Sequence, residues 1–171
     1  TVVNNLYPTL SDGARRALVH RAIESGEVLR IRRGLYILSR EIERSVVTKF
    51  CLVERIYPFS YVSFESALSF HGLIPEAVFS IGAASAKRSR NFNTPLGRFS
   101  FTRVTASPFY AGVENKRLGK IGFAPIATPT RAIADLIFVR KEISWEKDGS
   151  LFLTDSMRIE LEDLKKVFAW G

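Results

Sequence analysis

The sequence predicts an α/β (α+β) protein in which an N-terminal winged-helix-like module, residues 1–40, precedes a mixed α/β domain, residues 41–171. Three observations favour this interpretation. A helical pattern, a glycine and a basic ribbon follow one another near the N-terminus; strand and helix patterns interleave later; and positive charge is confined to two segments. With 171 residues, 46% of them hydrophobic, the chain is long and apolar enough for a packed core.

The first predicted helix begins near Ser11 and Asp12, either of which can accept hydrogen bonds from the free amides of the first turn. Its apolar residues recur at helical spacing and form one face: Ala14, Leu18, Val19, Ala22 and Ile23. Gly26 supplies the left-handed conformation that ends many helices. We therefore expect a short amphipathic helix with a polar opposite face.

The next residues predict a two-stranded hairpin. Apolar and basic side chains alternate along its first strand: Leu29, Arg30, Ile31 and Arg32. Residues 33–34 form the turn, and residues 35–38 form the returning strand. This order is that of the second half of a winged helix-turn-helix, in which the helix enters the major groove and the basic ribbon contacts phosphates.

The later part of the chain predicts alternating helices and strands. Helices are expected over residues 41–56, 63–71, 129–139 and about 160–169. Strands are expected over residues 78–84, 98–104 and 121–127. The polar, basic stretch 85–97 is expected to be a loop.

The distribution of charge indicates an anionic partner. The chain holds 25 Lys and Arg against 17 Asp and Glu, a formal net charge of +8, with a pI near 9.9. Residues 1–40 hold seven arginines against three acids, and residues 81–120 hold eight basic residues against one acid. Because the remaining segments are close to neutral, the positive charge is clustered in two segments and is not spread over the chain as it would be if it served solubility alone.

Six residues of the N-terminal module are candidate contacts to double-stranded DNA: Arg15, Arg16, His20, Arg30, Arg32 and Arg33. Arg16 and His20 lie one turn apart on the polar helix face, where a recognition helix meets base edges. The hairpin arginines are expected on phosphates, where they add affinity and salt dependence. A solvated helix and basic hairpin without a ligand are the alternative interpretation.

A second basic surface is expected from Lys87, Arg88, Arg90, Arg98 and Arg103. It would be an extra phosphate-binding surface or the docking site of an acidic partner. The alternative is a solvated loop beside an edge strand, where charges discourage strand pairing between molecules. The sequence leaves these interpretations open.

We expect no metal site, no cofactor and no membrane segment. The single Cys51 excludes an internal disulfide, and with only two histidines the chain has no Cys- or His-rich set of zinc ligands. Cys51 lies in an apolar helical pattern, where a buried, inert thiol is expected. No apolar run approaches the roughly 20 residues of a membrane span, and no signal peptide opens the chain, so we expect a cytoplasmic protein.

Catalysis has little support in the sequence, and we expect no enzyme. Asp135 with Glu146 is distantly similar to the acids of metal-dependent nucleases, which leaves a nuclease-like enzyme as one alternative. An RNA-binding module is another, because Phe92, Phe99 and Phe101 lie near basic residues and aromatic rings stack on bases. Phe99 and Phe101 share one strand face, however, which favours core packing.

Four segments, in order, resemble the AbiEi-type antitoxin family of bacterial type IV toxin–antitoxin systems. They are residues 26–36 (GEVLRIRRGLY), 61–74 (YVSFESALSFHGLI), 94–97 (TPLG) and 127–136 (ATPTRAIADL). The likeness covers about residues 15–140. The last segment departs from the family's pattern, which has Glu-Lys where this chain has Thr130-Arg131.

The resemblance implies a regulator of two domains. The winged domain would bind inverted repeats at its own promoter and act as an autorepressor, and the larger domain would be antitoxic. The implied partner is a nucleotidyltransferase-like toxin, which members of this family counteract without forming a stable complex.

Overall fold

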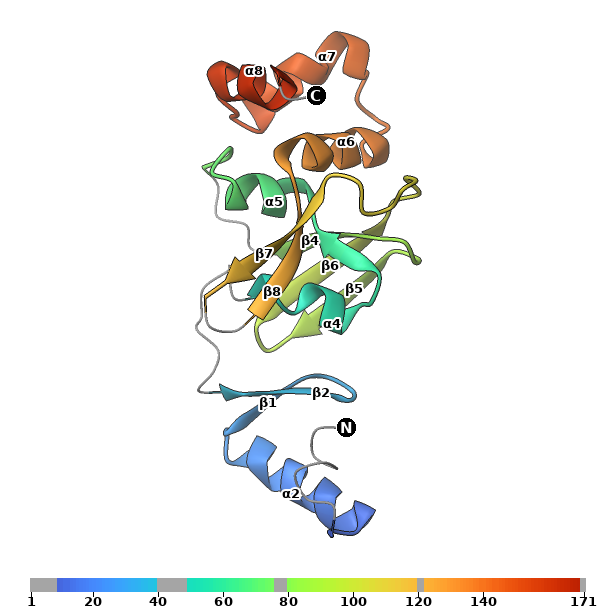
Figure 1. Ribbon diagram of the computed structural model, residues 1–171, viewed down its shortest axis with the longest axis vertical. Helices are drawn as coiled ribbons and strands as arrows, with labels where there is room; N and C mark the ends of the chain where they lie inside the picture. The colour runs from blue at the N-terminus through green and yellow to red at the C-terminus, as the bar shows by residue number, and fades with distance from the viewer. Residues whose placement is uncertain (1–8, 40–48, 76–79, 120–121, 170–171) are drawn as a thin grey trace. The chain divides into compact units, whose positions relative to one another are not determined.

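The computed structural model describes residues 9–39, 49–75, 80–119 and 122–169. The chain divides into two compact units, Thr1–Glu43 and Arg44–Gly171, which we call unit 1 and unit 2. Helices and strands are both present and one sheet is mixed, which confirms the predicted α/β class. Figure 1 shows the elements of each unit.

The described part of unit 1 is a helix followed by a hairpin. Its elements are α2 (Asp12–Glu24), β1 (Val28–Arg32) and β2 (Leu35–Leu38). Ser11 caps α2, since its Oγ accepts a hydrogen bond from the Ala14 amide at 3.2 Å. Gly26 follows the helix with a φ of 74°. The predicted helix, its cap and the hairpin are therefore confirmed.

The predicted apolar face of α2 is half-buried. Leu18, Val19 and Ile23 have intermediate exposure, whereas Ile31 of β1 is 4% exposed. Helix α2 contacts β1, so this face lies toward the hairpin. Ile31 is the one fully buried side chain among the described residues of unit 1.

Unit 2 is built on a six-stranded mixed sheet with the order β5-β6-β4-β3-β8-β7. The strands are β3 (Ser60–Val62), β4 (Ser80–Ser85), β5 (Arg90–Thr94), β6 (Gly97–Arg103), β7 (Val113–Leu118) and β8 (Gly122–Ala127). Strand β4 pairs parallel with β6, and β3 parallel with β8; the other pairs are antiparallel. Phe99 and Phe101 of β6 are 0% and 1% exposed, which confirms that they belong to the core.

Helices cover both faces of this sheet. They are α4 (Val53–Ile56), α5 (Phe64–Phe70), α6 (Pro129–Val139), α7 (Trp145–Leu151) and α8 (Leu161–Ala169), with a π-helix at Phe152–Ser156. In Figure 1, α5 and α6 lie together on one side of the sheet and α4 lies on the other, with α7 and α8 beyond α6. The Thr130 hydroxyl donates to the Val167 carbonyl at 3.2 Å and so joins α6 to α8.

Several predictions for unit 2 were wrong in detail. Residues 85–97, expected to be a loop, contain strand β5, which pairs with β6 at the edge of the sheet. Strands β3 and β7 and helix α7 were not predicted. Of the helix expected over residues 41–56, residues 41–48 lie outside the described residues; residues 49–50 are helical, residues 51–52 form a turn, and α4 follows. The remaining predicted helices and strands are confirmed to within about two residues.

Candidate nucleic-acid interface

Helix α2 presents a polar face on which Arg16 and His20 are exposed. His20 lies one turn before Glu24, with its Nδ1 at 3.3 Å from a Glu24 carboxylate oxygen. Arg15 differs from them: it is half-buried and its guanidinium lies 3.0 Å from the Asp12 carboxylate. The structure thus places Arg16 and His20 where a ligand can reach them, whereas Arg15 is held against the first turn of its own helix.

The hairpin places its cations on the exposed side of the ribbon and at its tip. Arg30 lies opposite Tyr36, and Arg30, Arg32 and Tyr36 are exposed while Ile31 points inward. Arg33 is exposed at the turn, next to Gly34, whose φ is 81°. The apolar and basic alternation predicted from the sequence is therefore present in the ribbon.

Within unit 1 the chain reverses direction after α2, and β1 runs back along the helix (Figure 1). The hairpin turn and the N-terminal half of α2 consequently lie at the same end of this unit. Arg16 belongs to the N-terminal half of α2, and Arg33 belongs to the turn. A cationic helix face and a cationic ribbon tip are the two parts that a winged module applies to a duplex.

The five residues of the second predicted basic surface do not lie together: four are grouped at one end of the sheet, and Arg98 is separate from them. Lys87 and Arg88 lie in the turn between β4 and β5, Arg90 begins β5, and Arg103 ends β6. The Arg103 amide donates to the Ser89 hydroxyl at 2.9 Å, which joins the strand end to the turn.

Arg98 lies apart from these cations. It is the second residue of β6, five residues or about 17 Å of strand from Arg103. It is exposed opposite Asn93, on the other face of the sheet from Arg90 and Phe92. The sequence prediction grouped Arg98 with the other four because strand register is not visible in composition.

Aromatic rings accompany the four grouped cations. The Lys87 Nζ lies 4.9 Å from the ring centroid of Phe59 and 5.5 Å from that of Tyr57. The Arg90 guanidinium lies 5.8 Å from the Phe92 centroid. Tyr57, Arg90 and the turn line a recess of about 400 Å³. Phe59, 58% exposed, carried no signal in the sequence that distinguished it from core phenylalanines.

A larger recess, of about 520 Å³, opens on the opposite face of the sheet between α6 and β6. Its one cation is Arg140, whose guanidinium lies 3.1 Å from Glu65 and 3.6 Å from Glu142. Because two acids already face this cation, the recess offers an anion no uncompensated charge.

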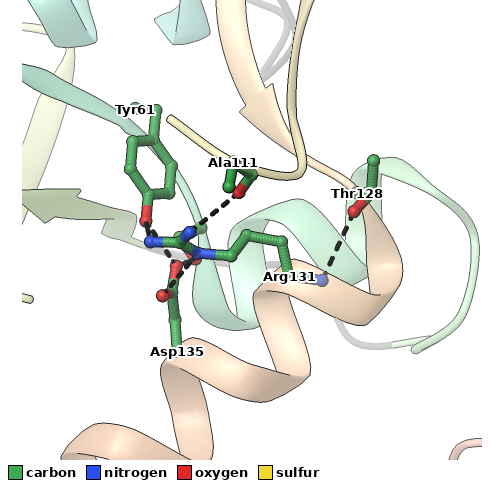
Figure 2. Close-up of polar contacts among 6 residues, drawn as sticks. Tyr61, Ala111, Thr128, Arg131 and Asp135 are labelled. Atoms are coloured by element: carbon green, nitrogen blue, oxygen red, sulfur yellow. Dashed lines mark hydrogen bonds and ion pairs between the residues drawn. The ribbon is translucent and has the colours of Figure 1, made fainter. Parts of the chain in front are cut away.

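A buried polar cluster joins α6 to the sheet (Figure 2). The Arg131 Nε donates to Asp135 Oδ1 at 2.9 Å, and its Nη1 donates to the Ala111 carbonyl at 2.8 Å. Asp135 Oδ2 accepts from the Tyr61 hydroxyl at 2.9 Å and from the Ser63 hydroxyl at 2.6 Å. A further hydrogen bond links Arg131 Nη2 to the Tyr61 oxygen, and burial together with the Asp135 carboxylate raises the pKa of Tyr61.

This cluster unites two of the four segments that resemble the AbiEi-type family. Tyr61 and Ser63 come from segment 61–74, and Arg131 and Asp135 from segment 127–136. Arg131 stands where the AbiEi-type pattern has lysine. It therefore keeps a positive charge next to the Asp135 carboxylate. No buried side-chain nitrogen or oxygen of the described residues lacks a hydrogen-bond partner, so the cluster is a closed structural unit.

The geometry of Asp135 argues against the nuclease-like alternative. Asp135 is 2% exposed and both of its oxygens accept hydrogen bonds, whereas Glu146 is exposed on α7. The other residues considered for catalysis or metal binding have structural surroundings as well. The His71 Nε2 forms a hydrogen bond with the Ala127 carbonyl at 2.9 Å. Burial raises the pKa of the Cys51 thiol. Among the described residues no cluster of His, Cys, Asp and Glu forms a metal site.

The sequence fits no protein-family model, and no curated protein matches it. The AbiEi-type resemblance therefore rests on the four segments quoted above. Within the part of the chain that the structure describes, no helix has both the length and the apolar character needed to cross a bilayer.

Proposed function

We propose that this protein is a sequence-specific DNA-binding transcriptional regulator that acts as the autorepressor and antitoxin of a type IV toxin–antitoxin system. One observation carries the DNA-binding part. Unit 1 presents Arg16 and His20 on the exposed face of a short helix and Arg30 and Arg33 on the hairpin that runs back along it. All four side chains are exposed.

The two cationic elements suit different parts of a duplex. The major groove admits one α-helix, and an arginine on that helix pairs with guanine through two hydrogen bonds. A ribbon tip that lies beside the groove contacts phosphates, which adds affinity without reading sequence. Arg16 and His20 would therefore select the operator, and Arg30 and Arg33 would anchor the protein to it.

The antitoxic part of the proposal is supported by the family resemblance alone. It assigns unit 2 the task of counteracting a nucleotidyltransferase-like toxin without a stable complex. The cytoplasm is the corresponding location, since both the operator and the toxin's substrates are found there.

Fluorescence anisotropy with a labelled duplex from the protein's own promoter tests DNA binding. We expect the affinity to fall steeply with salt, and the double substitution of Arg30 and Arg33 by Ala to flatten the log–log slope by about 1.8, or 0.9 for each lost phosphate contact. Arg16→Ala should instead lower the preference for promoter over scrambled duplex by about tenfold. The exposed lysines Lys147 and Lys165, both replaced by Ala, give a control with the same change in charge.

Equal affinity for promoter and scrambled duplex would contradict sequence-specific regulation. So would a loss of binding in the lysine control as large as that in the arginine variant. Co-expression with the toxin gene separates the two roles. The Arg30 and Arg33 double variant should lose repression of a promoter reporter and still rescue growth.

A further inference from the structure

We propose that unit 2 carries a second nucleic-acid site, a cationic–aromatic surface that binds single-stranded nucleic acid. The surface consists of Phe59, Lys87, Arg88, Arg90 and Arg103. Phe59 would stack on a base, and the four cations would contact phosphates. This goes beyond the proposed function, which requires only duplex binding by unit 1.

Hydrogen bonds bring these residues together from four parts of the chain. The Ala86 amide donates to the Phe59 carbonyl at 3.0 Å, which ties the turn after β4 to the residue before β3. The Tyr57 hydroxyl donates to the Arg88 carbonyl at 3.1 Å. On the other side of the turn, Ser89 accepts from the Arg103 amide. The surface is thus fixed by the sheet rather than carried on a free loop.

Phe59 is held outward in an unfavourable backbone conformation. Its φ is 63°, a region that bulky residues rarely adopt, and its side chain is 58% exposed. Its carbonyl accepts a second hydrogen bond, from the Ser85 hydroxyl at 3.4 Å, which helps to maintain that conformation. Because the Phe59 ring is exposed, this strained backbone conformation does not serve packing of the core. Strained backbone conformations of this kind are concentrated at functional sites.

No acidic side chain in the described part of the chain forms an ion pair with the cations of this surface. No carboxylate of a described residue lies within 4.0 Å of the charged groups of Lys87, Arg88, Arg90 or Arg103. All four side chains are exposed. Four like charges at one end of a sheet repel one another, and an anionic chain would relieve that repulsion.

The aromatic ring selects a single strand among anionic ligands. Base faces are covered in a duplex and open in a single strand, where stacking on an aromatic side chain tolerates any base. The recess of about 400 Å³ lined by Tyr57, Arg90 and the turn between β4 and β5 falls within the range of small-ligand pockets, about 300–1,000 Å³. An acidic peptide would use the cations but would offer the Phe59 ring no base to stack on.

Anisotropy titration of the full-length protein with labelled oligouridylate and oligothymidylate of about 12 nucleotides tests the proposal. Phe59→Asn removes the ring and suits the positive φ, so the variant should stay folded. We expect it to bind about tenfold more weakly with an unchanged salt slope, whereas Lys87→Ala should flatten the slope by about 0.7. Phe168→Asn, at a ring that is 55% exposed on α8, and Lys147→Ala are the matched controls.

Tight binding of either oligonucleotide supports the site. If oligouridylate binds more tightly, the ligand is RNA; if oligothymidylate does, the ligand is DNA. Absence of binding overturns the proposal, as does wild-type affinity in both Phe59→Asn and Phe59→Leu. Competition by polyglutamate as strong as that by oligouridylate would assign the surface to an acidic protein instead. The Arg30 and Arg33 double variant should retain oligonucleotide binding, so failure of promoter binding and failure of this site are distinguishable.

Discussion

Replacement of Arg131 by methionine should destabilise unit 2 strongly, because it leaves a buried carboxylate without its cation. Arg131 is 9% exposed and Asp135 is 2% exposed. Methionine keeps the length of the arginine stem and removes the hydrogen bonds to Asp135, Ala111 and Tyr61. Removing one partner of a buried ion pair costs about 3–5 kcal/mol. Because the Tyr61 and Ser63 hydroxyls still donate to Asp135, we expect a loss near the lower limit, about 3 kcal/mol.

Urea unfolding followed by tryptophan fluorescence measures this loss in the right part of the chain. Both tryptophans, Trp145 and Trp170, belong to unit 2. The midpoint should fall while the dependence of the unfolding free energy on urea stays unchanged. Arg131→Lys, which keeps the charge and loses the forked geometry, should cost only about 1 kcal/mol.

A double-mutant cycle decides whether the unpaired charge is the cause. The protein with both Arg131→Met and Asp135→Asn should be more stable than Arg131→Met alone, since no uncompensated carboxylate remains. If the double variant is no more stable than the single one, the cost arises from lost packing and the interpretation of the cluster is wrong. A loss of less than about 1 kcal/mol of unfolding free energy in Arg131→Met would also refute this interpretation of the cluster.

Three further predictions concern the same region. Gly112→Ala should destabilise unit 2 by about 1–3 kcal/mol in urea unfolding, because its φ is 70° and an added Cβ would lie 3.0 Å from the Arg131 Cβ. Thr128→Ala should cost about 1 kcal/mol through loss of the α6 cap, whereas Thr128→Ser should cost little. The raised pKa of Tyr61 means that the folded protein keeps a proton which the unfolded chain loses above about pH 10. Stability should therefore fall as pH rises above about 10, and Tyr61→Phe should show a smaller fall in unfolding free energy over that range.

The strands that the sequence did not reveal include both edges of the sheet. Strand β5 (Arg90–Thr94) and strand β7 (Val113–Leu118) each pair with one neighbour only. Polar and charged residues dominate both, and such residues at an edge discourage pairing with another molecule. Their stability comes from main-chain hydrogen bonds to β6 and β8, which leave no apolar alternation to detect. Strand β6, one place further in, shows that alternation and was predicted from it.

Helix α7 was not predicted for a different reason. It contains Gly149, which usually indicates a turn, and the structure shows that the glycine is required by packing. An added Cβ at this position would lie 2.9 Å from the Trp145 ring, so only glycine allows the tryptophan to lie across the helix. Contacts of this kind depend on the rotamer of one side chain and have no pattern in the sequence.

The candidate sites differ in how far the sequence revealed them. Alternation within five residues was enough to place Arg30 and Arg32 on the exposed side of the hairpin. Two of the partners of Asp135, Ser63 and Tyr61, are 72 and 74 residues away along the chain, so its burial could not be read from its neighbours in sequence. Phe59 was missed because its exposure depends on a backbone conformation set by the turn after β4.

The segments that resemble the AbiEi-type family play two separable roles. Segments 61–74 and 127–136 meet in the buried cluster, so the fold of unit 2 alone is a sufficient reason for their residues. Segment 26–36 is different, because Arg30 and Arg33 are exposed rather than buried. The proposed contact with DNA accounts for these cations. Variants of the cluster should therefore change the unfolding free energy of unit 2, whereas variants of Arg30 and Arg33 should change DNA binding at constant stability. If the cluster variants abolished promoter binding while the protein stayed folded, and the Arg30 and Arg33 variants did not, the assignment of DNA binding to segment 26–36 would be wrong.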